Sequence, residues 1–183
     1  FAPVARSLHF RIYRKRFMIK IIEGNIVDAQ TDYIIHQVNC QGEMNTGVAK
    51  ALRDYDEGIY IHYRNVCKLR EFNPELLLGT YDEYFIRRKN QEILSLFAQD
   101  KYGYDGKQYT DVKAFREGLN FIRQQIPVYW FDADNRPHKT TIALPYKIGC
   151  GRGGADWEVV YKIIEEELSS FEVELWKLEE QNV

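Results

Sequence analysis

Apolar residues along this chain gather in short runs, separated by segments in which they recur every three or four positions. The runs at 18–22, 33–40, 92–98 and 140–145 are rich in Ile, Val and Leu. Such runs are typical of buried strands. A weaker alternation at 79–87 predicts a further strand, which a hairpin turn joins to the next apolar run.

The segments between the runs have the period of amphipathic helices. After the strand at 33–40 we expect a helical region that extends from 48 to 69. Thr110 is placed to cap a second helix, which Pro127 ends, and Trp157 begins a third. The chain therefore alternates between strands and helices over most of its length.

Residues 171–176 alternate between charged and apolar side chains, which predicts an edge strand with one face in water. The stretch 128–139 carries an Asp-x-Asp fragment without the remainder of a calcium loop, so we interpret it as a polar turn and not as a metal site. The expected fold is a three-layer α/β/α domain around a mixed, largely parallel sheet of about six strands.

Composition adds limits to this picture. The length of 183 residues suits one domain with a substantial core. No apolar run approaches the roughly 18 residues of a membrane-spanning helix, so we expect no membrane association. The three cysteines, Cys40, Cys67 and Cys150, are an odd number without metal-ligand spacing, and they favour a reducing cytoplasm over a disulfide framework.

Residues 1–17 differ from the rest of the chain. They contain no acidic residue and five basic ones: Arg6, Arg11, Arg14, Lys15 and Arg16. We interpret 1–17 as a vector-derived or upstream extension and 18–183 as a single domain; an arm that binds nucleic acid is the alternative. Without the extension, 20 basic residues (25 less 5) stand against 27 acidic ones, which disfavours extended binding to a nucleic-acid backbone.

Four glycines are concentrated between the run at 140–145 and the helix at Trp157. The loop reads Ile148-Gly149-Cys150-Gly151-Arg152-Gly153-Gly154, followed by Ala155-Asp156. Glycine lacks the Cβ atom that would hold a ligand away, and it permits positive φ angles that let successive N–H groups converge. With the dipole of the helix that follows, the loop predicts a phosphate cradle. A tight turn without a ligand is the alternative.

A second loop of this kind follows the run at 33–40. It reads Gln41-Gly42-Glu43-Met44-Asn45-Thr46-Gly47-Val48 and leads into a helix. Two strand–loop–helix units can place two cradles at the carboxyl ends of one sheet, and two cradles suit a ligand with two linked phosphates. Neither loop has the Gly-Lys-Ser/Thr of a P-loop or the GxGxxG pattern of a dinucleotide site, so we expect no cofactor.

Three motifs carry a wider resemblance. They are Glu23-Gly24-Asn25-Ile26, His36-Gln37-Val38-Asn39-Cys40 with its glycine loop, and Ile148-Gly149-Cys150-Gly151 running to Asp156-Trp157. In this order they resemble the macrodomain family of ADP-ribose-binding proteins, and the resemblance covers about 18–178. Within this family the chain most resembles the branch that is similar to ADP-ribose-1''-phosphate phosphatases. The alternative is the branch that contains DNA- and protein-ADP-ribosylglycohydrolases. The resemblance implies the macrodomain form of the α/β/α fold.

The resemblance implies ADP-ribose or a derivative as ligand. Gly24, Asn25 and Ile26 would hold adenine, with an Asn where macrodomains usually have Asp; a simple turn is the alternative for Asn25. Cys40 and Cys150 would let the backbone approach the ligand, and a catalytic thiol is the alternative. The diphosphate and distal ribose would contact Asn39, Cys40, Gly42, Asn45, Thr46, Gly47, Val48, Ile148, Gly149, Cys150, Gly151, Arg152, Gly153 and Gly154. Nucleic acid would be a partner only as an ADP-ribosylated substrate.

Three residues are candidates for catalysis. The phosphatase branch has a functional histidine at the place of His36, which would act as acid, base or phosphate contact; a buried histidine bonded to the backbone is the alternative. Asp156 would polarise a water or merely cap the next helix. Asn39 would contact the distal ribose, although it would face away from His36 on a regular strand. A loop beginning at Asn39 would remove that conflict.

The glycohydrolase branch has a catalytic lysine after the strand that corresponds to 92–98, where this chain has Gln99, and Lys101 comes two positions later. This departure favours hydrolysis of ADP-ribose 1''-phosphate to ADP-ribose and phosphate. The alternatives are a glycohydrolase that removes ADP-ribose from protein or nucleic acid, and a binding module without turnover. The loop 99–109 adds tyrosines that could face a sugar or base.

Overall fold

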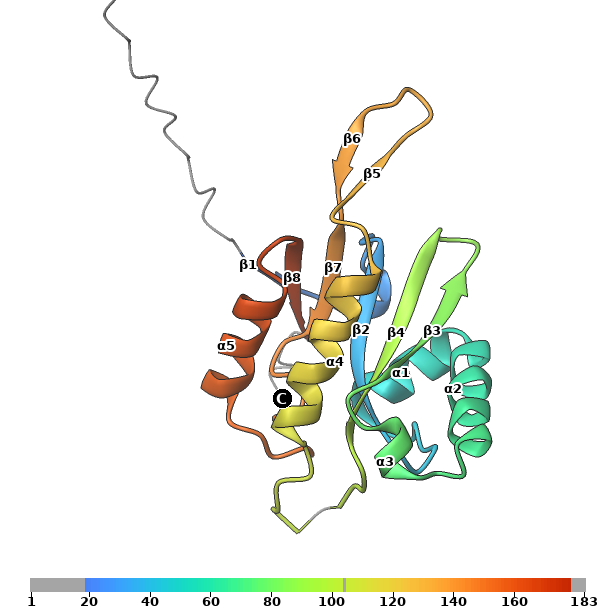
Figure 1. Ribbon diagram of the computed structural model, residues 1–183, viewed down its shortest axis with the longest axis vertical. Helices are drawn as coiled ribbons and strands as arrows, with labels where there is room; N and C mark the ends of the chain where they lie inside the picture. The colour runs from blue at the N-terminus through green and yellow to red at the C-terminus, as the bar shows by residue number, and fades with distance from the viewer. Residues whose placement is uncertain (1–18, 104, 179–183) are drawn as a thin grey trace, which may run out of the picture.

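The computed structural model describes residues 19–103 and 105–178; the extension that we inferred at 1–17 lies outside them. Within this part of the chain, six strands form one sheet in the order β1-β8-β7-β2-β4-β3, and β5 pairs with β6 in a separate hairpin (Figure 1). Neighbouring strands of the large sheet run parallel, except that β3 is antiparallel to β4. The expected mixed, largely parallel sheet is confirmed.

The order of elements alternates as the hydrophobic pattern predicted. The strands are β1 (Ile19–Glu23), β2 (Tyr33–Asn39), β3 (Tyr81–Ile86), β4 (Gln91–Gln99), β5 (Tyr129–Phe131), β6 (Pro137–Lys139), β7 (Thr141–Pro145) and β8 (Glu172–Lys177). The helices are α1 (Gly47–Tyr55), α2 (Glu57–Leu69), α3 (Pro74–Leu77), α4 (Val112–Gln125) and α5 (Trp157–Glu167), with a 3-10 helix η1 (Ile26–Asp28). None of these helices is long and apolar enough to cross a membrane.

Helices cover both faces of the sheet, and each face has its own core (Figure 1). Phe115 of α4 and Ile164 of α5 pack on one face, together with Ile35 of β2. Ile34 and Val38 of the same strand enter the other core, beneath α1 and α2. Alternation of side chains along β2 therefore supplies both cores, which places this strand at the centre of the molecule.

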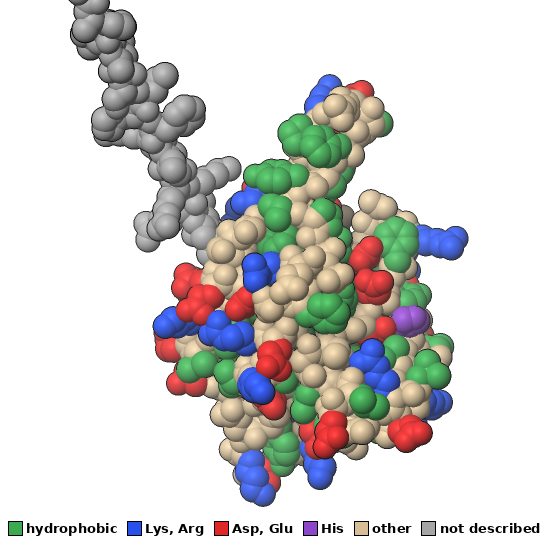
Figure 2. Space-filling model, viewed as in Figure 1, with side chains coloured by type: hydrophobic (Ala, Val, Ile, Leu, Met, Phe, Trp, Pro, Cys, Tyr) green, Lys and Arg blue, Asp and Glu red, His purple; other side chains and the backbone are tan. Residues whose placement is uncertain are grey.

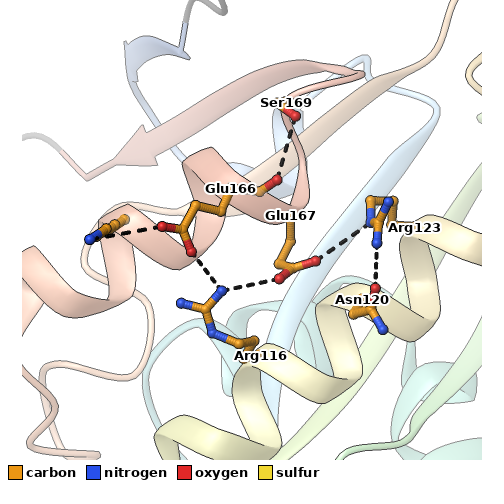
Figure 3. Close-up of polar contacts among 7 residues, drawn as sticks. Arg116, Asn120, Arg123, Glu166, Glu167 and Ser169 are labelled. Carbon is orange, nitrogen blue, oxygen red and sulfur yellow. Dashed lines mark hydrogen bonds and ion pairs between the residues drawn. The ribbon is translucent and has the colours of Figure 1, made fainter.

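Ion pairs join the outer surfaces of α4 and α5 (Figure 3). Arg116 donates to Glu166 and Glu167 over 2.6 and 3.2 Å, and Arg123 Nε lies 3.5 Å from Glu167 Oε2. The arginine side chains are partly exposed, so we expect each pair to contribute up to about 1 kcal/mol. The pairs help to fix α5, whose amino end follows the glycine loop.

β8 is not the edge strand that its alternation predicted. It lies between β1 and β7 and pairs with both. Val173 and Leu175 are buried against the α4–α5 core, while Glu172 and Glu174 on the other face are half-buried. The alternation therefore reflects how well each face is covered, which does not depend on whether the strand lies at an edge.

Two helix boundaries also differ from the prediction. The helical region at 48–69 breaks at Asp56, whose carboxylate accepts from Gly58 N over 3.0 Å and caps α2. α4 is capped by Asp111, which accepts from Ala114 N over 2.9 Å, and not by Thr110. A cap at Asp111 leaves the Thr110 side chain to make contacts elsewhere.

The stretch 128–139 forms the hairpin of β5 and β6, where we expected only a polar turn. It projects beyond the amino end of β7 (Figure 1), and apolar side chains gather on it (Figure 2). Trp130 stacks on His138 with ring centroids 4.4 Å apart, and His138 Nε2 lies 2.9 Å from Asp132 Oδ2. Asp132 also accepts from Asp134 N and Arg136 N, so the Asp-x-Asp fragment shapes the hairpin turn.

Candidate ligand-binding site

A cavity of about 560 Å³ opens at the carboxyl ends of β2 and β7. Its volume lies in the range of small-molecule sites. Both loops that the sequence singled out contribute to its lining. The predicted site residues that line it are His36, Asn39, Asn45, Thr46, Gly47, Val48, Ile148, Gly149, Gly151, Arg152 and Gly153.

The amino end of α1 forms one wall of the cavity. The N-cap residue, Thr46, makes no side-chain cap bond. The first N–H groups of a helix have no acceptor within the helix, and those of Gly47, Val48 and Ala49 donate to no other backbone or side-chain acceptor in the described part of the chain. All three residues line the cavity. This wall therefore offers convergent donors and a helix dipole to an anion.

The glycine loop forms the facing wall. The N–H groups of Gly149, Gly151 and Gly153 donate to no acceptor among residues 19–103 and 105–178, and all three residues line the cavity. The intervening Cys150 N instead closes a turn on Lys147 O over 3.0 Å. Alternating N–H groups thus remain available for a ligand, as expected of a backbone anion nest.

Two glycines of this loop are required by packing within the protein as well as by the approach of a ligand. A Cβ atom on Gly149 would lie 2.7 Å from Gln37 Oε1, and one on Gly153 would overlap Thr110 Oγ1 and Gly149 O. A Cβ atom on Gly151 would meet nothing within 4 Å. Gly151 is therefore the position where a missing side chain leaves open space beside the cavity.

Gln37 and Thr110 support the glycine loop from beneath. Gln37 Nε2 donates to Thr110 Oγ1 over 2.8 Å and to Gln99 Oε1 over 2.7 Å, and Thr110 Oγ1 donates to Gly149 O over 2.8 Å. Thr110 N also donates to Gly153 O over 2.9 Å. Thr110 therefore holds both ends of the loop, a role that its position before a helix did not suggest.

Asn39 holds the other loop. Its Oδ1 accepts from Gln41 N over 2.9 Å and Glu43 N over 3.3 Å, and its Nδ2 donates to Glu43 O over 2.8 Å. Tyr63 of α2 donates its hydroxyl to Asn39 O over 2.7 Å. The pairing of β2 with β4 shifts register between Val38 and Asn39, so the regular alternation that opposed Asn39 to His36 ends at this point.

His36 is 1% exposed and lines the cavity. Its Nε2 lies 3.0 Å from Ser95 Oγ on β4, whereas Nδ1 has no hydrogen-bond partner in the described part of the chain. Burial lowers the pKa of His36 to about 3. The imidazole is therefore neutral near neutral pH, and it is suited to hydrogen bonding rather than to proton donation as an imidazolium.

Several predicted residues do not line the cavity: Gly24, Asn25, Ile26, Cys40, Gly42, Cys150, Gly154 and Asp156. Asn25 caps η1 by accepting from Val27 N over 3.2 Å. Asp156 is exposed and caps α5 by accepting from Glu158 N over 2.8 Å. Cys40 is fully buried, and this burial raises the pKa of its thiol to about 12, so it is not a thiolate near neutral pH.

The lining also contains residues that we had not assigned to the site: Gln37, Val38, Glu43, Ala49, Gln99, Tyr102, Pro145, Tyr146 and Lys147. Three of them, Gln37, Val38 and Glu43, lie within the motifs, and most of the others flank the motifs directly. Lys147 has a φ angle of 57°, a conformation that is uncommon outside glycine. Tyr102 comes from the loop whose tyrosines suggested contact with a sugar or base.

The end of β4 presents an amide to the cavity and not an ammonium group. Gln99 lines the cavity and accepts from Gln37 Nε2. Its own Nε2 donates to Lys101 O over 3.0 Å. Lys101 is exposed and does not belong to the lining. Of the two residues that could correspond to the catalytic lysine of the glycohydrolase branch, Gln99 lines the cavity and Lys101 does not.

No family model matches the chain. Among curated proteins it is similar to a DNA ADP-ribosyl transferase–DNA ADP-ribosyl glycohydrolase fusion protein of Thermosipho africanus, with 20% identity over 167 residues. The match covers 85% of this chain and 40% of the fusion protein. The chain therefore spans less than half the length of that relative.

Solved structures resemble the chain over most of its length. The macrodomain of Thermus aquaticus DarG has a TM-score of 0.66 at 24% identity, covering 89% of this chain and 99% of its own. The macrodomain of Mycobacterium tuberculosis DarG has 0.67 at 20%, covering 87% and 97%. Thermosipho africanus DarTG in complex with ADP-ribose has 0.66 at 17%, covering 90% and 43%. This chain has the macrodomain fold.

Proposed function

We propose that this chain binds ADP-ribose or a derivative in the cavity between α1 and the glycine loop. The observation that carries the proposal is the pair of N–H clusters, one on each wall, without acceptors in the described part of the chain. A diphosphate supplies anionic oxygens for both clusters at once. The similar structure of Thermosipho africanus DarTG is a complex with ADP-ribose, which supports the same ligand here.

The rest of the ligand can be assigned from the surroundings of the two clusters. η1 packs against both α1 and β7, so adenine would extend from the diphosphate towards Asn25 and Ile26. The distal ribose would lie towards Asn39 and Tyr102, which also line the cavity. The exposed phenol of Tyr102 would then offer a flat face to the sugar.

Calorimetry with ADP-ribose and AMP tests this arrangement. AMP has one phosphate and can engage only one N–H cluster, so we expect it to bind at least about tenfold more weakly than ADP-ribose. Equal affinities would contradict the proposal that both walls grip one diphosphate. Absence of ADP-ribose binding at millimolar concentration would remove the proposed function altogether.

The first candidate reaction is hydrolysis of ADP-ribose 1''-phosphate. N–H groups of the glycine loop would stabilise charge on the phosphoryl oxygens while water attacks phosphorus. Neutral His36 would hydrogen-bond to the phosphate or water through Nδ1, which has no partner in the described part of the chain. Asp156 would act indirectly, through its cap on α5. Release of inorganic phosphate by the wild-type protein, reduced in His36→Ala, tests this reaction.

The second candidate reaction is removal of ADP-ribose from a macromolecule. The name of the curated relative includes a DNA ADP-ribosyl glycohydrolase, and this similarity favours the reaction. Gln99 cannot replace a nucleophilic lysine, so another group would have to assist the cleavage. Free ADP-ribose released from an ADP-ribosylated oligonucleotide would support this candidate. Formation of neither product would leave binding without turnover.

A further inference from the structure

Glu43 differs from the other residues of the cavity. It provides the only carboxylate among the lining residues that the structure describes. It is half-buried, and its carboxylate forms no ion pair within 19–103 and 105–178. Lys147 and Arg152 of the lining favour anions, whereas the Glu43 carboxylate opposes the binding of a diphosphate. Its presence therefore calls for a chemical role.

The backbone of Glu43 is held in place by Asn39. The Asn39 side chain donates to Glu43 O over 2.8 Å and accepts from Glu43 N over 3.3 Å. Asn39 is itself fixed by Tyr63, whose hydroxyl lies 3.0 Å from Asn39 Oδ1. The carboxylate therefore extends from a backbone anchored to Asn39, beside which we place the distal ribose.

The carboxylate is also oriented at its tip. Asn45 Nδ2 donates to Glu43 Oε2 over 2.5 Å, and Arg53 Nη1 donates to Asn45 Oδ1 over 2.9 Å. The Arg53 guanidinium lies 4.2 Å from the centroid of the Tyr60 ring. This chain of contacts fixes the asparagine amide with its N–H towards Glu43, and it leaves Oε1 of the carboxylate without a hydrogen-bond partner among the described residues.

We propose that Glu43 is the catalytic carboxylate for cleavage of the glycosidic bond at C1'' of the distal ribose. This inference rests on the proposed binding of ADP-ribose. Cleavage of such a bond develops positive charge on the sugar, which a nearby carboxylate stabilises. The same negative charge repels a phosphate dianion at C1''. Glu43 therefore favours the second candidate reaction over the first, and the substrate class is a C1''-glycoside of ADP-ribose.

The reaction balances with water as the only co-substrate. The bond between C1'' and the leaving atom breaks, and its electron pair goes to the leaving group. A water oxygen forms the new bond to C1'', and Oε1 of Glu43 takes one proton from that water. The proton returns to solvent, and the leaving group takes up a proton from solvent, so free ADP-ribose and the unmodified macromolecule result.

The test compares Glu43→Gln with the wild type. The amide keeps the size and the hydrogen bond to Asn45 through its carbonyl oxygen, but it removes charge and basicity. With an ADP-ribosylated oligonucleotide and an ADP-ribosylated glutamyl peptide as substrates, we expect kcat for ADP-ribose release to fall about 10²- to 10⁴-fold, with KM within about threefold. Glu158→Gln, on the exposed first turn of α5, is the matched control and should behave as wild type.

Arg53→Gln tests the orientation of the carboxylate. It leaves Glu43 in place but removes the guanidinium that fixes Asn45, so we expect kcat to fall by about three- to tenfold with unchanged thermal stability. Arg53→Lys should recover part of the loss.

The outcomes separate this inference from the proposed function. If the wild type binds ADP-ribose but releases it from neither substrate, the role of Glu43 is refuted and the binding proposal stands. Wild-type turnover by Glu43→Gln refutes it equally. If the wild type does not bind ADP-ribose, both fail. Calorimetry on Glu43→Gln should show ADP-ribose affinity that is equal to or above that of the wild type, because a negative charge near the diphosphate has been removed.

Discussion

The two walls of the cavity present the same groups to a ligand but are stabilised in different ways. The loop before α1 is held by its own Asn39, which bonds residues two and four positions ahead. The glycine loop is held by Thr110, which lies 39 positions away from Gly149 in the sequence, and by Gln37 beneath it. The loop before α1 is therefore held mainly by hydrogen bonds within the loop, with Tyr63 as a further partner, whereas the glycine loop depends on tertiary contacts.

This difference explains what each loop demands of its sequence. The first loop needs one side chain with both a donor and an acceptor, and it needs glycine at 42 and 47, where φ is positive. The glycine loop rests directly on Thr110 and Gln37, so its positions 149 and 153 must lack side chains. We therefore expect substitutions in the glycine loop to act through steric overlap, and those in the first loop through lost hydrogen bonds.

The largest effect on ligand binding should come from Gly153→Ala. The added methyl group overlaps Thr110 Oγ1 and Gly149 O, and we expect a loss of about 1–3 kcal/mol in stability and about 100-fold or more in ADP-ribose affinity. Gly151→Ala is the control, since its methyl group meets no protein atom within 4 Å. Urea unfolding and calorimetry measure both quantities. A full stability loss in Gly151→Ala would contradict the steric explanation.

Asn39→Ala should have the largest effect on stability. It removes the acceptor for two N–H groups and the donor to Glu43 O, and we expect the free energy of unfolding to fall by about 2–4 kcal/mol. Tyr63→Phe removes only the hydroxyl that donates to Asn39 and should cost about 1 kcal/mol. Hydrogen exchange should show loss of protection in 40–46 and not in 149–155. Equal loss in both loops would argue against local stabilisation.

The stability of the protein at acid pH should depend on His36, the buried histidine of the cavity. Burial lowers the pKa of His36 from 6.5 to about 3, so on acidification the unfolded chain binds the proton first. The contribution is fully present above about pH 6.5, and stability should decrease by about 1.4 kcal/mol per pH unit as pH falls towards 3. His36→Gln should have a flatter stability profile between pH 6.5 and 4 in urea unfolding. An unchanged slope in the variant would show that other groups dominate.

Thr110→Val should have the smallest of these effects. It preserves the shape of the side chain but removes the donor to Gly149 O and the acceptor for Gln37, so we expect ADP-ribose affinity to fall by about tenfold. Thr110→Ser keeps the hydroxyl and should remain within about threefold of wild type. If valine and serine bind equally well, the hydroxyl does not position the loop.

The sequence predicted those parts of the site that depend on neighbouring residues. The glycines at 149, 151 and 153 and the loop before α1 were recognisable because flexible residues directly follow apolar runs. Cys40 was assigned to the ligand from its place beside Asn39, but it is fully buried. Adjacent residues on a strand face opposite sides of the sheet. The register shifts at this point, so the period-two pattern could not predict which side each residue faces.

Other features depend on long-range contacts that no local pattern contains. The role of Thr110 requires its approach to Gly149, and the interior position of β8 requires its pairing with both β1 and β7. Glu43 lies within a predicted loop, but nothing in the chain indicated that it would be the acidic residue among the described residues that line the cavity. Likewise, the exposed hairpin at 129–139 had the composition of a turn.

Consecutive residues of β2 serve opposite walls of the cavity. His36 contacts Ser95 on the side of α1 and α2, whereas Gln37 contacts Thr110 under the glycine loop. Asn39, at the end of the same strand, holds the loop before α1, so β2 contributes to the position of both walls of the cavity. A displacement of this strand would move both walls of the cavity together. The distance between the walls should therefore be preserved when the sequences of the two loops change.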